Sequence, residues 1–304
     1  MFEQIMLSVF STAFLASVLR ITTPILFAAL ASAVSERAGV ANIGLEGIMM
    51  MAALFGVLFS AWTQSAFVGV VGAAFVGALI GLMMGFFYIK MKTDIILAGI
   101  AINMLGGGGT VFFLFILAGQ RGTSAALPSK MVPSLSLSFL ENVPIFAAFS
   151  GQSILTYLVF VCVILVHILF YKTTLGLKIR AVGENPHASD SVGLNVDKIR
   201  YISLALSGFL AGLGGAYMSM FASMGFSTDM VAGRGFIALA AQAMGRGQPL
   251  GVMLSSLLFG GSDALSNHMQ GTGLPSQLVT ALPYVITIVG LTVYSARKMK
   301  RRIY

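Results

Sequence analysis

Residues 47–89 read GIMMMAALFGVLFSAWTQSAFVGVVGAAFVGALIGLMMGFFYI, and none of these 43 residues is charged. An α-helix needs about 20 apolar residues to cross the ~30 Å hydrocarbon core of a bilayer. This run is therefore long enough for two membrane spans. The polar residues 62–65 divide it, and Trp62 suits a membrane–water interface. The stretch predicts an all-α, polytopic membrane protein.

The composition of the whole chain agrees with a membrane protein. Only 9% of the 304 residues are charged and 57% are hydrophobic, whereas a soluble domain is roughly one quarter charged. A soluble enzyme and a nucleic-acid-binding protein are thereby excluded, and the net charge of +8 is expected in loops. The single cysteine, Cys162, allows no intrachain disulfide and no cysteine-ligated metal site. The acidic start, Met-Phe-Glu-Gln, predicts that the first apolar segment is not cleaved as a signal peptide.

Other apolar runs extend the set of predicted spans. One span each is predicted for the uncharged runs 95–120, 142–171, 201–228 and 264–296. Residues 21–35 give a shorter span, and residues 5–19 before it are expected to form an interfacial helix. Residues 236–244 are too short to cross and predict a half-helix in front of a further span at 250–267. The expected total is about nine transmembrane segments with the half-helix included.

The basic residues predict the orientation of these spans. If the loop 172–200 is cytoplasmic, alternation of the spans leaves four of the 18 Lys and Arg residues outside and the other 14 inside. The four outside are Arg20, Arg121, Lys130 and Arg234. Because cytoplasmic loops carry the excess of Lys and Arg, the N-terminus is expected outside the cell and the C-terminus in the cytoplasm. The protein is expected in the cell membrane.

An internal repeat is predicted within one membrane domain of residues 1–304. In each half a span is followed by a break, at 35–44 and at 223–235, and then by a further helix. Inverted repeats with broken helices are typical of transporters, because unwound backbone at membrane depth must be covered by protein or a water-filled path. Alternatively, such breaks arise by chance in any polytopic protein. The predicted halves are about 20–118 and 200–296, linked by an outer loop, one span and the cytoplasmic loop 172–200.

Glycine occurs in two distinct patterns. A spacing of four residues, typical of closely packed helices, is seen at Gly77, Gly81 and Gly85 and again at Gly208 and Gly212. Residues 106–109 are instead four consecutive glycines, each about 1 kcal/mol less favourable than alanine in a helix. We expect a kink, a wide turn or a moving gate there.

Several kinds of chemistry are not expected of this chain. It contains no Gly-Lys dipeptide, so it lacks a phosphate-binding P-loop and is not expected to hydrolyse ATP itself. The three histidines have no metal-binding partner at helical spacing, and no nucleophile motif is present. We therefore expect no catalytic residue, no metal site and no cofactor.

The predicted spans carry polar residues that suit a path for a neutral solute with many hydrogen-bonding groups. Asn103 lies nine residues after Asp94, about 13 Å along a helix, and so near the midplane. For Asn103 an amide that bonds a neighbouring helix is an equal alternative, and Glu46 can also be explained as interfacial. The candidate path residues are Asn42, Glu46, Asn103 and Gln242.

The loop 172–200 contains signals for a short helix on the cytoplasmic side. Asn185 is a good N-cap, Pro186 suits the first helical position and Gly193 can end the helix, so residues 186–192 are predicted to be helical. Asp197 can cap the next span. Such a helix can dock into a partner and transmit its motion, or it can be a simple amphipathic connector.

Three segments resemble a known family. GLKIRAVGENP at 176–186, followed by Ala188 and Gly193, resembles the coupling loop of permease subunits of ABC importers that serve branched-chain amino acids, ribose-type sugars and nucleosides. ERAGVANIGLEG at 36–47 resembles the early loop of the nucleoside and simple-sugar branch, and it lacks the Gly-Gly-x-Asp-Leu-Ser pattern of ribose permeases. GRGFIALA at 233–240 with GRGQPLG at 245–251 also fits this family.

The resemblance implies the partners and the activity. They are ABC ATPase subunits that grip the 186–192 helix, a second homologous permease subunit, and an extracytoplasmic solute-binding lipoprotein that docks on the outer loops 121–152 and 223–234. The ATPase-coupling residues are expected to be Gly183, Glu184, Asn185, Pro186, His187, Ala188, Val192 and Gly193. The expected function is ATP-driven import of a neutral polar solute, with nucleosides as the expected solute. The alternatives are a simple-sugar permease, an ion-coupled secondary transporter, which the scarcity of embedded acids disfavours, and a membrane enzyme.

Overall fold

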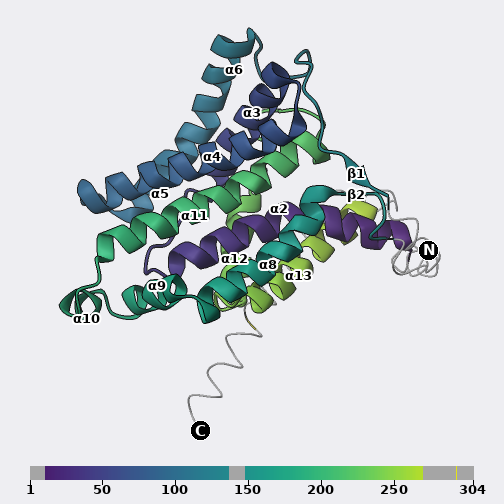
Figure 1. Cartoon of the computed structure of the whole chain (residues 1–304). Coiled ribbons are helices and arrows are strands. Elements are labelled where there is room, and N and C mark those ends of the chain that lie inside the picture. The colour runs from purple at the N-terminus through teal and green to yellow at the C-terminus, as the bar shows by residue number, and fades with distance from the viewer. Residues whose placement is uncertain (1–10, 137–147, 270–291, 293–304) are drawn as a thin grey trace.

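Three helices form the middle of the protein and are buried along most of their length: α2 (Thr12–Glu36), α3 (Leu45–Thr63) and α11 (Val196–Tyr217). The computed structural model describes residues 11–136, 148–269 and 292. Every α2 residue from 22 to 35 is buried, as expected for a helix that is apolar on all sides. In Figure 1, α11 runs between α2 and α4 (Ala66–Gly85) and packs against both.

The other elements surround these three helices. They are η1 (Phe86–Lys90), α5 (Ile95–Met104), η2 (Leu105–Gly109), α6 (Thr110–Ala118), β1 (Ser134–Leu135), β2 (Gln152–Ser153), α8 (Ile154–Lys172), α9 (Thr174–Glu184), α10 (Pro186–Ser191), η3 (Met218–Ala222), α12 (Arg234–Met244) and α13 (Pro249–Met269). The two short strands pair antiparallel, with Ser134 opposite Ser153. They lie at the end of the molecule opposite α10 (Figure 1).

Six helical stretches among the described residues are long and apolar enough to cross a membrane: Thr12–Glu36, Leu45–Thr63, Ala66–Lys90, Ile95–Ala118, Ile154–Lys172 and Val196–Ala222. The half-helix predicted at 236–244 is present as α12, whose 11 residues reach about 16 Å. α13 follows it and is not one of the six. The count of about nine is not confirmed, because most of the span predicted at 264–296 lies outside the described residues.

Two helix boundaries show where local signals succeeded and failed. The predicted division at 62–65 is confirmed: Gln64 ends α3 with φ at 52°, and the Ser65 side chain accepts the first hydrogen bond of α4. The prediction of a separate interfacial helix before Arg20 is wrong for the described residues. Thr12 to Glu36 form one helix that contains Arg20, because a single charged side chain does not interrupt the backbone hydrogen bonds.

Both glycine patterns have a structural explanation. A Cβ on Gly208 would lie 2.8 Å from the carbonyl carbon of Gly77, so α4 and α11 approach closely only because both residues are glycine. The four consecutive glycines lie in η2, a π-helical turn, which confirms the predicted wide turn. Gly106 packs against the backbone of Gly47 in α3, whereas Gly107 has open space beside it.

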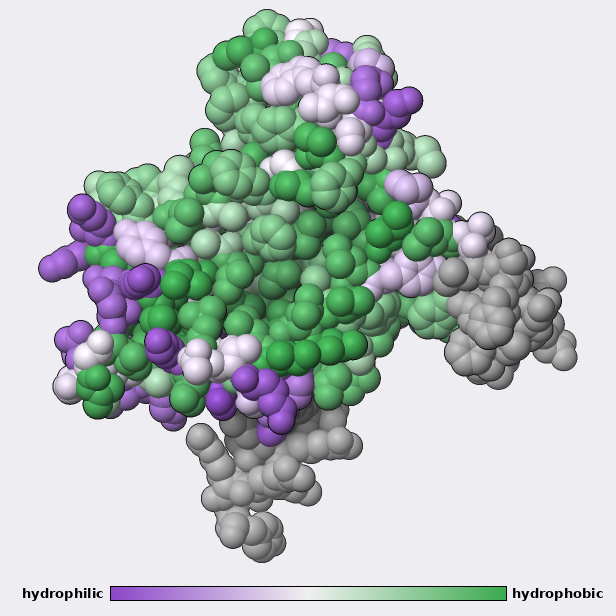
Figure 2. All heavy atoms as spheres, in the orientation of Figure 1, coloured by the Kyte–Doolittle hydropathy of each residue, from purple (hydrophilic) through white to green (hydrophobic). Residues whose placement is uncertain are grey.

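The surface separates into hydrophobic and hydrophilic regions, as the sequence separates into apolar runs and charged loops. Figure 2 shows hydrophobic side chains across the broad face made by α4, α11 and α8, while hydrophilic side chains gather at the end that carries α10. The stretch Ile95–Ala118 is the most exposed of the six, because only 22% of an apolar segment of 18 residues within it is buried. An apolar surface of this extent is typical of helices that face lipid or another membrane subunit.

Candidate functional site

Loops that were predicted to lie on the same side of the membrane contact one another. At the end that carries α10, here called the α10 end, the Arg37 guanidinium donates to the carbonyl oxygens of Gly247 (3.2 Å) and Arg246 (3.1 Å). At the opposite end, here called the far end, Ser124 and Phe226 exchange hydrogen bonds of 2.9 and 2.8 Å. The described part of the chain therefore has two loop-bearing ends separated by apolar helices.

The α10 end carries the short helix that the sequence predicted. The Asn185 side chain accepts a hydrogen bond of 3.0 Å from the Ala188 amide, and Pro186 is the first residue of the helix. Gly193 follows with φ at 85° and ends it. The N-cap, the first residue and the terminating glycine are therefore confirmed.

The exposed side chains of this segment form a surface that a partner can reach. Glu184, Asn185, His187 and Ala188 are exposed, and Val192 is 76% exposed although it is apolar. A cavity of about 580 Å³ lies between α10 and the start of α11, and Pro186, Asp190 and Arg200 are among the residues that line it. These side chains and this hollow together leave the segment open to contact by another protein.

Two details of this loop differ from expectation. The side chain of Asn195, and not that of Asp197, caps α11 by accepting from the Lys198 amide at 2.8 Å. Asp197 instead lies in the first turn of α11, where its negative charge interacts favourably with the positive end of the helix dipole. The loop also contains α9, an additional amphipathic helix that buries Ile179 and Val182 against Ala38 and Ile199.

Gly183 joins this loop to the first chain break. A Cβ on Gly183 would overlap the Arg37 carbonyl oxygen and would lie 3.1 Å from the Gly39 amide nitrogen. Backbone therefore packs directly on backbone here, which only glycine permits. The last turn of α9 is in this way seated on the segment that leads from α2 to α3.

The break predicted at 35–44 is observed at residues 37–44, because α2 continues to Glu36. Amide side chains provide hydrogen-bond partners for its backbone groups. The fully buried Asn42 donates to the Ser207 hydroxyl of α11 at 2.9 Å and accepts from the Gly44 amide at 3.1 Å. Asn103 of α5 donates to the Ile43 carbonyl at 3.0 Å and accepts from the Gly47 amide at 2.9 Å. These bonds replace the helical ones that the break lacks.

Glu46 links the break to the second half of the chain. Its two carboxylate oxygens accept hydrogen bonds of 2.7 Å each from the backbone amides of Gly233 and Gly235, at the first turn of α12. A carboxylate at a helix N-terminus is stabilised both by the unpaired N–H groups and by the helix dipole. The first turn of α3, directly after the first break, therefore contacts the end of the second break.

The four predicted path residues are not in one place. Asn42, Glu46 and Asn103 gather around the first break, whereas Gln242 lies near the other end of α12, beside Glu36. In the described structure the first three hold backbone groups, which agrees with the alternative considered for Asn103. Their contact with a solute stays a prediction.

A second cavity, of about 550 Å³, lies at the far end between α2, η3 and the start of α12. Its lining includes Arg20, Tyr217, Phe221, Met230 and Arg234, and we call it the outer cavity. Small-molecule sites are concave spaces of about this size, and this one has a mixed polar and apolar lining. The Tyr217 hydroxyl faces those of Thr23 and Thr156 but has no well-aligned hydrogen-bond partner among the described residues.

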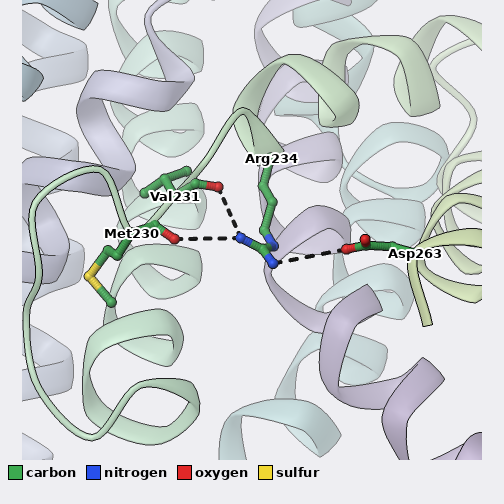
Figure 3. Close-up of polar contacts among 4 residues, drawn as sticks. All are labelled: Met230, Val231, Arg234 and Asp263. Carbon is green, nitrogen blue, oxygen red and sulfur yellow. Dashed lines mark hydrogen bonds and ion pairs between the residues drawn. The ribbon is translucent and has the colours of Figure 1, made fainter. Parts of the chain in front are cut away.

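Arg234 connects the segments that surround the outer cavity. Figure 3 shows its guanidinium between the loop that precedes α12 and α13, where it donates to the Val231 carbonyl at 3.2 Å and lies 3.9 Å from the Asp263 carboxylate. From the sequence, Arg20 and Arg234 were predicted only as basic residues on the outer side. Their position beside apolar runs was the signal that could have placed them at a cavity.

Comparison with known proteins adds family information to this geometry. Residues 14–291 match the family described as branched-chain amino acid transport system / permease component. The chain is 35% identical to the nucleoside ABC transporter permease protein NupC of Lactococcus lactis, over 92% of this chain and 91% of that protein. It is 33% identical to the guanosine ABC transporter permease protein NupQ of Bacillus subtilis, over 90% and 89%.

Two further likenesses are more distant. The chain is 30% identical to the putative glucose ABC transporter permease protein TsgC13 of Haloferax volcanii, over 93% of this chain and 92% of that protein. Among solved structures, it resembles an inward-facing conformation of a putative metal-chelate type ABC transporter, with a TM-score of 0.51 and 15% identity over 93% of this chain and 85% of the other. At that identity the likeness concerns the fold alone.

Proposed function

Because this chain belongs to the permease family of branched-chain amino acid transport systems, we propose that it is the membrane-spanning subunit of an ATP-driven ABC importer for nucleosides. In this proposal partner ATPase subunits hydrolyse the ATP, a second homologous permease completes the pathway, and an extracytoplasmic solute-binding lipoprotein delivers the solute. The chain itself is a conduit and not an enzyme.

The observation that carries the proposal is the capped helix α10, presented at one end of an otherwise apolar bundle. Its exposed neighbours Glu184, His187 and Val192 give an ATPase a surface to hold. Gly183 seats the same segment on the break at 37–44, so movement of α10 reaches the membrane helices through backbone contact. The ATPase-coupling role of residues 183–188, 192 and 193 rests on this arrangement.

The same contacts support the proposed orientation. The α10 end carries Arg37, Arg246 and the loop 172–200, which the excess of basic residues assigns to the cytoplasm. The far end carries Arg20 and Arg234 around the outer cavity. We place the N-terminus outside and the C-terminus in the cytoplasm, with inverted halves at about 20–118 and 200–296 in one domain of 1–304.

The choice of nucleosides rests on the relatives. NupC and NupQ are named as nucleoside and guanosine permeases, and both match over about nine tenths of this chain. A simple sugar is the second candidate because TsgC13, named as a putative glucose permease, is 30% identical. The outer cavity suits either solute, since it offers hydroxyl and guanidinium donors beside aromatic and aliphatic side chains.

The test is reconstitution of this chain with its ATPase, its companion permease and its solute-binding protein in liposomes. We expect uptake of labelled guanosine or uridine that requires ATP and is lost when the ATPase P-loop lysine is replaced. Labelled ribose and glucose added in parallel distinguish the sugar alternative. Uphill uptake by this chain alone, driven by a proton or sodium gradient, would overturn the proposal.

A further inference from the structure

We propose that the Glu46 carboxylate and the N-terminus of α12 form a gate beneath the outer cavity, which closes the route from this cavity to the α10 end and opens once in each transport cycle. We call this pair of hydrogen bonds the 46–235 clasp. The inference rests on the proposed transport function. It makes Glu46 a positioning residue that acts through α12.

The clasp is a specific and reversible closure. Both Glu46 oxygens are used, each at 2.7 Å, and the donors are the amides of Gly233 and Gly235. Gly235 fits so tightly that a Cβ there would lie 2.7 Å from the Glu46 amide nitrogen. Among the described residues, no other side-chain hydrogen bond joins α3 to α12, so release of this one carboxylate removes the polar link between the two helices.

The clasp adjoins the outer cavity through Arg234. This residue lies between the two donor glycines in the sequence, and its side chain lines the cavity and approaches Asp263 (Figure 3). A solute that binds the Arg234 guanidinium competes with the Val231 carbonyl and the Asp263 carboxylate, which now hold this side chain. Because Arg234 is the first residue of α12 and lies between the two amides that hold Glu46, occupancy of the cavity is in this proposal linked to closure of the clasp.

The other end of α12 is tied to the α10 end. Its last residues run into the turn at 245–248, and Arg37 binds the carbonyl oxygens of Arg246 and Gly247 in that turn. Arg37 in turn lies under Gly183 of α9. Motion at α10 thus has a continuous route through α9, Arg37 and the 11 residues of α12 to the clasp.

Two variants weaken the clasp by different means. Glu46→Gln keeps the shape of the side chain but removes its charge, and hydrogen bonds to a neutral acceptor at a helix N-terminus are weaker. Gly235→Ala keeps the carboxylate and forces it away from the amides. The matched controls are Asp94→Asn, which alters a carboxylate cap that serves only its own helix, and Gly261→Ala, which has open space beside it.

The assay uses the complete reconstituted importer. Liposomes preloaded with labelled nucleoside report ATP-independent efflux, and ATP hydrolysis is measured with and without loaded binding protein. For both clasp variants we expect roughly tenfold faster efflux without ATP and a rise in the solute-independent ATPase rate. The controls should match the wild-type chain.

Each remaining outcome counts against the gate. Clasp variants that behave like the controls would overturn the proposed gate, because the two hydrogen bonds would then have no part in keeping the pathway closed. Folded variants that lose uptake without leaking, or failure of both variants to fold while the controls do, would reduce the clasp to a static joint. If the wild-type importer moves no nucleoside, the proposed substrate fails, yet the solute-independent ATPase rate still reports on the gate.

Discussion

Replacement of Gly183 by alanine is the sharpest test of how α9 transmits motion. The new Cβ would overlap the Arg37 carbonyl oxygen and would lie 2.9 Å from its carbonyl carbon. Favourable contacts between carbon atoms are about 3.5–4.0 Å, so α9 must move away from the break by roughly 0.6 Å or more. Overpacking of this kind costs about 1–3 kcal/mol, which lowers the population of seated α9 roughly 5- to 160-fold.

We expect Gly183→Ala to insert and fold, because Ile179 and Val182 still anchor α9 in their buried cluster. ATP hydrolysis should continue while solute uptake per ATP falls at least about fivefold. The assay measures uptake and phosphate release from the same proteoliposomes, with Gly261→Ala as a control because nothing lies within 4 Å of that position. A Gly183→Ala importer with wild-type uptake per ATP would refute the reasoning.

Three further predictions follow from individual contacts. Asn185→Ala removes the N-cap of α10 and should destabilise that helix by about 1 kcal/mol, seen as weaker ATPase binding in a pull-down titration. Asn42→Ala leaves the buried Ser207 hydroxyl and one backbone amide without this partner and should lower the free energy of unfolding by about 1–3 kcal/mol, measured by thermal denaturation in detergent. Gly77→Ala should lower Tm because its Cβ would meet the backbone of α11. Gly107→Ala, which has open space beside it, should leave Tm unchanged or raise it. Equal effects of the two variants on Tm would contradict the close packing of α4 against α11.

The elements with strong local signals were predictable from the sequence. The uncharged run 47–89 gave two helices, and the first of them ended at Gln64, among the polar residues that were expected to divide the run. The α10 helix was predicted through Asn185, Pro186 and Gly193, since capping depends on residues a few positions apart. Local patterns of this kind are visible without knowledge of the tertiary structure.

The parts that depend on distant contacts were not predictable in the same way. Arg20 was expected to separate an interfacial helix from a span, but both belong to α2, whose length is set by its burial among neighbouring helices. The polar residues Asn42 and Asn103 were candidates for solute contact, yet their partners lie 165 and 60 residues away and include backbone groups of the break. No pattern in a single sequence states which distant backbone group an amide will satisfy.

The double attachment of α12 has a mechanical consequence. A helix of 11 residues that is held by contacts at both ends is too short and stiff to bend appreciably, so it shifts or tilts as a rigid body. Displacement applied at one tip then arrives at the other almost undiminished. The rate at which α12 moves is therefore set by the lifetimes of the contacts at its two ends, and not by bending of the helix between them.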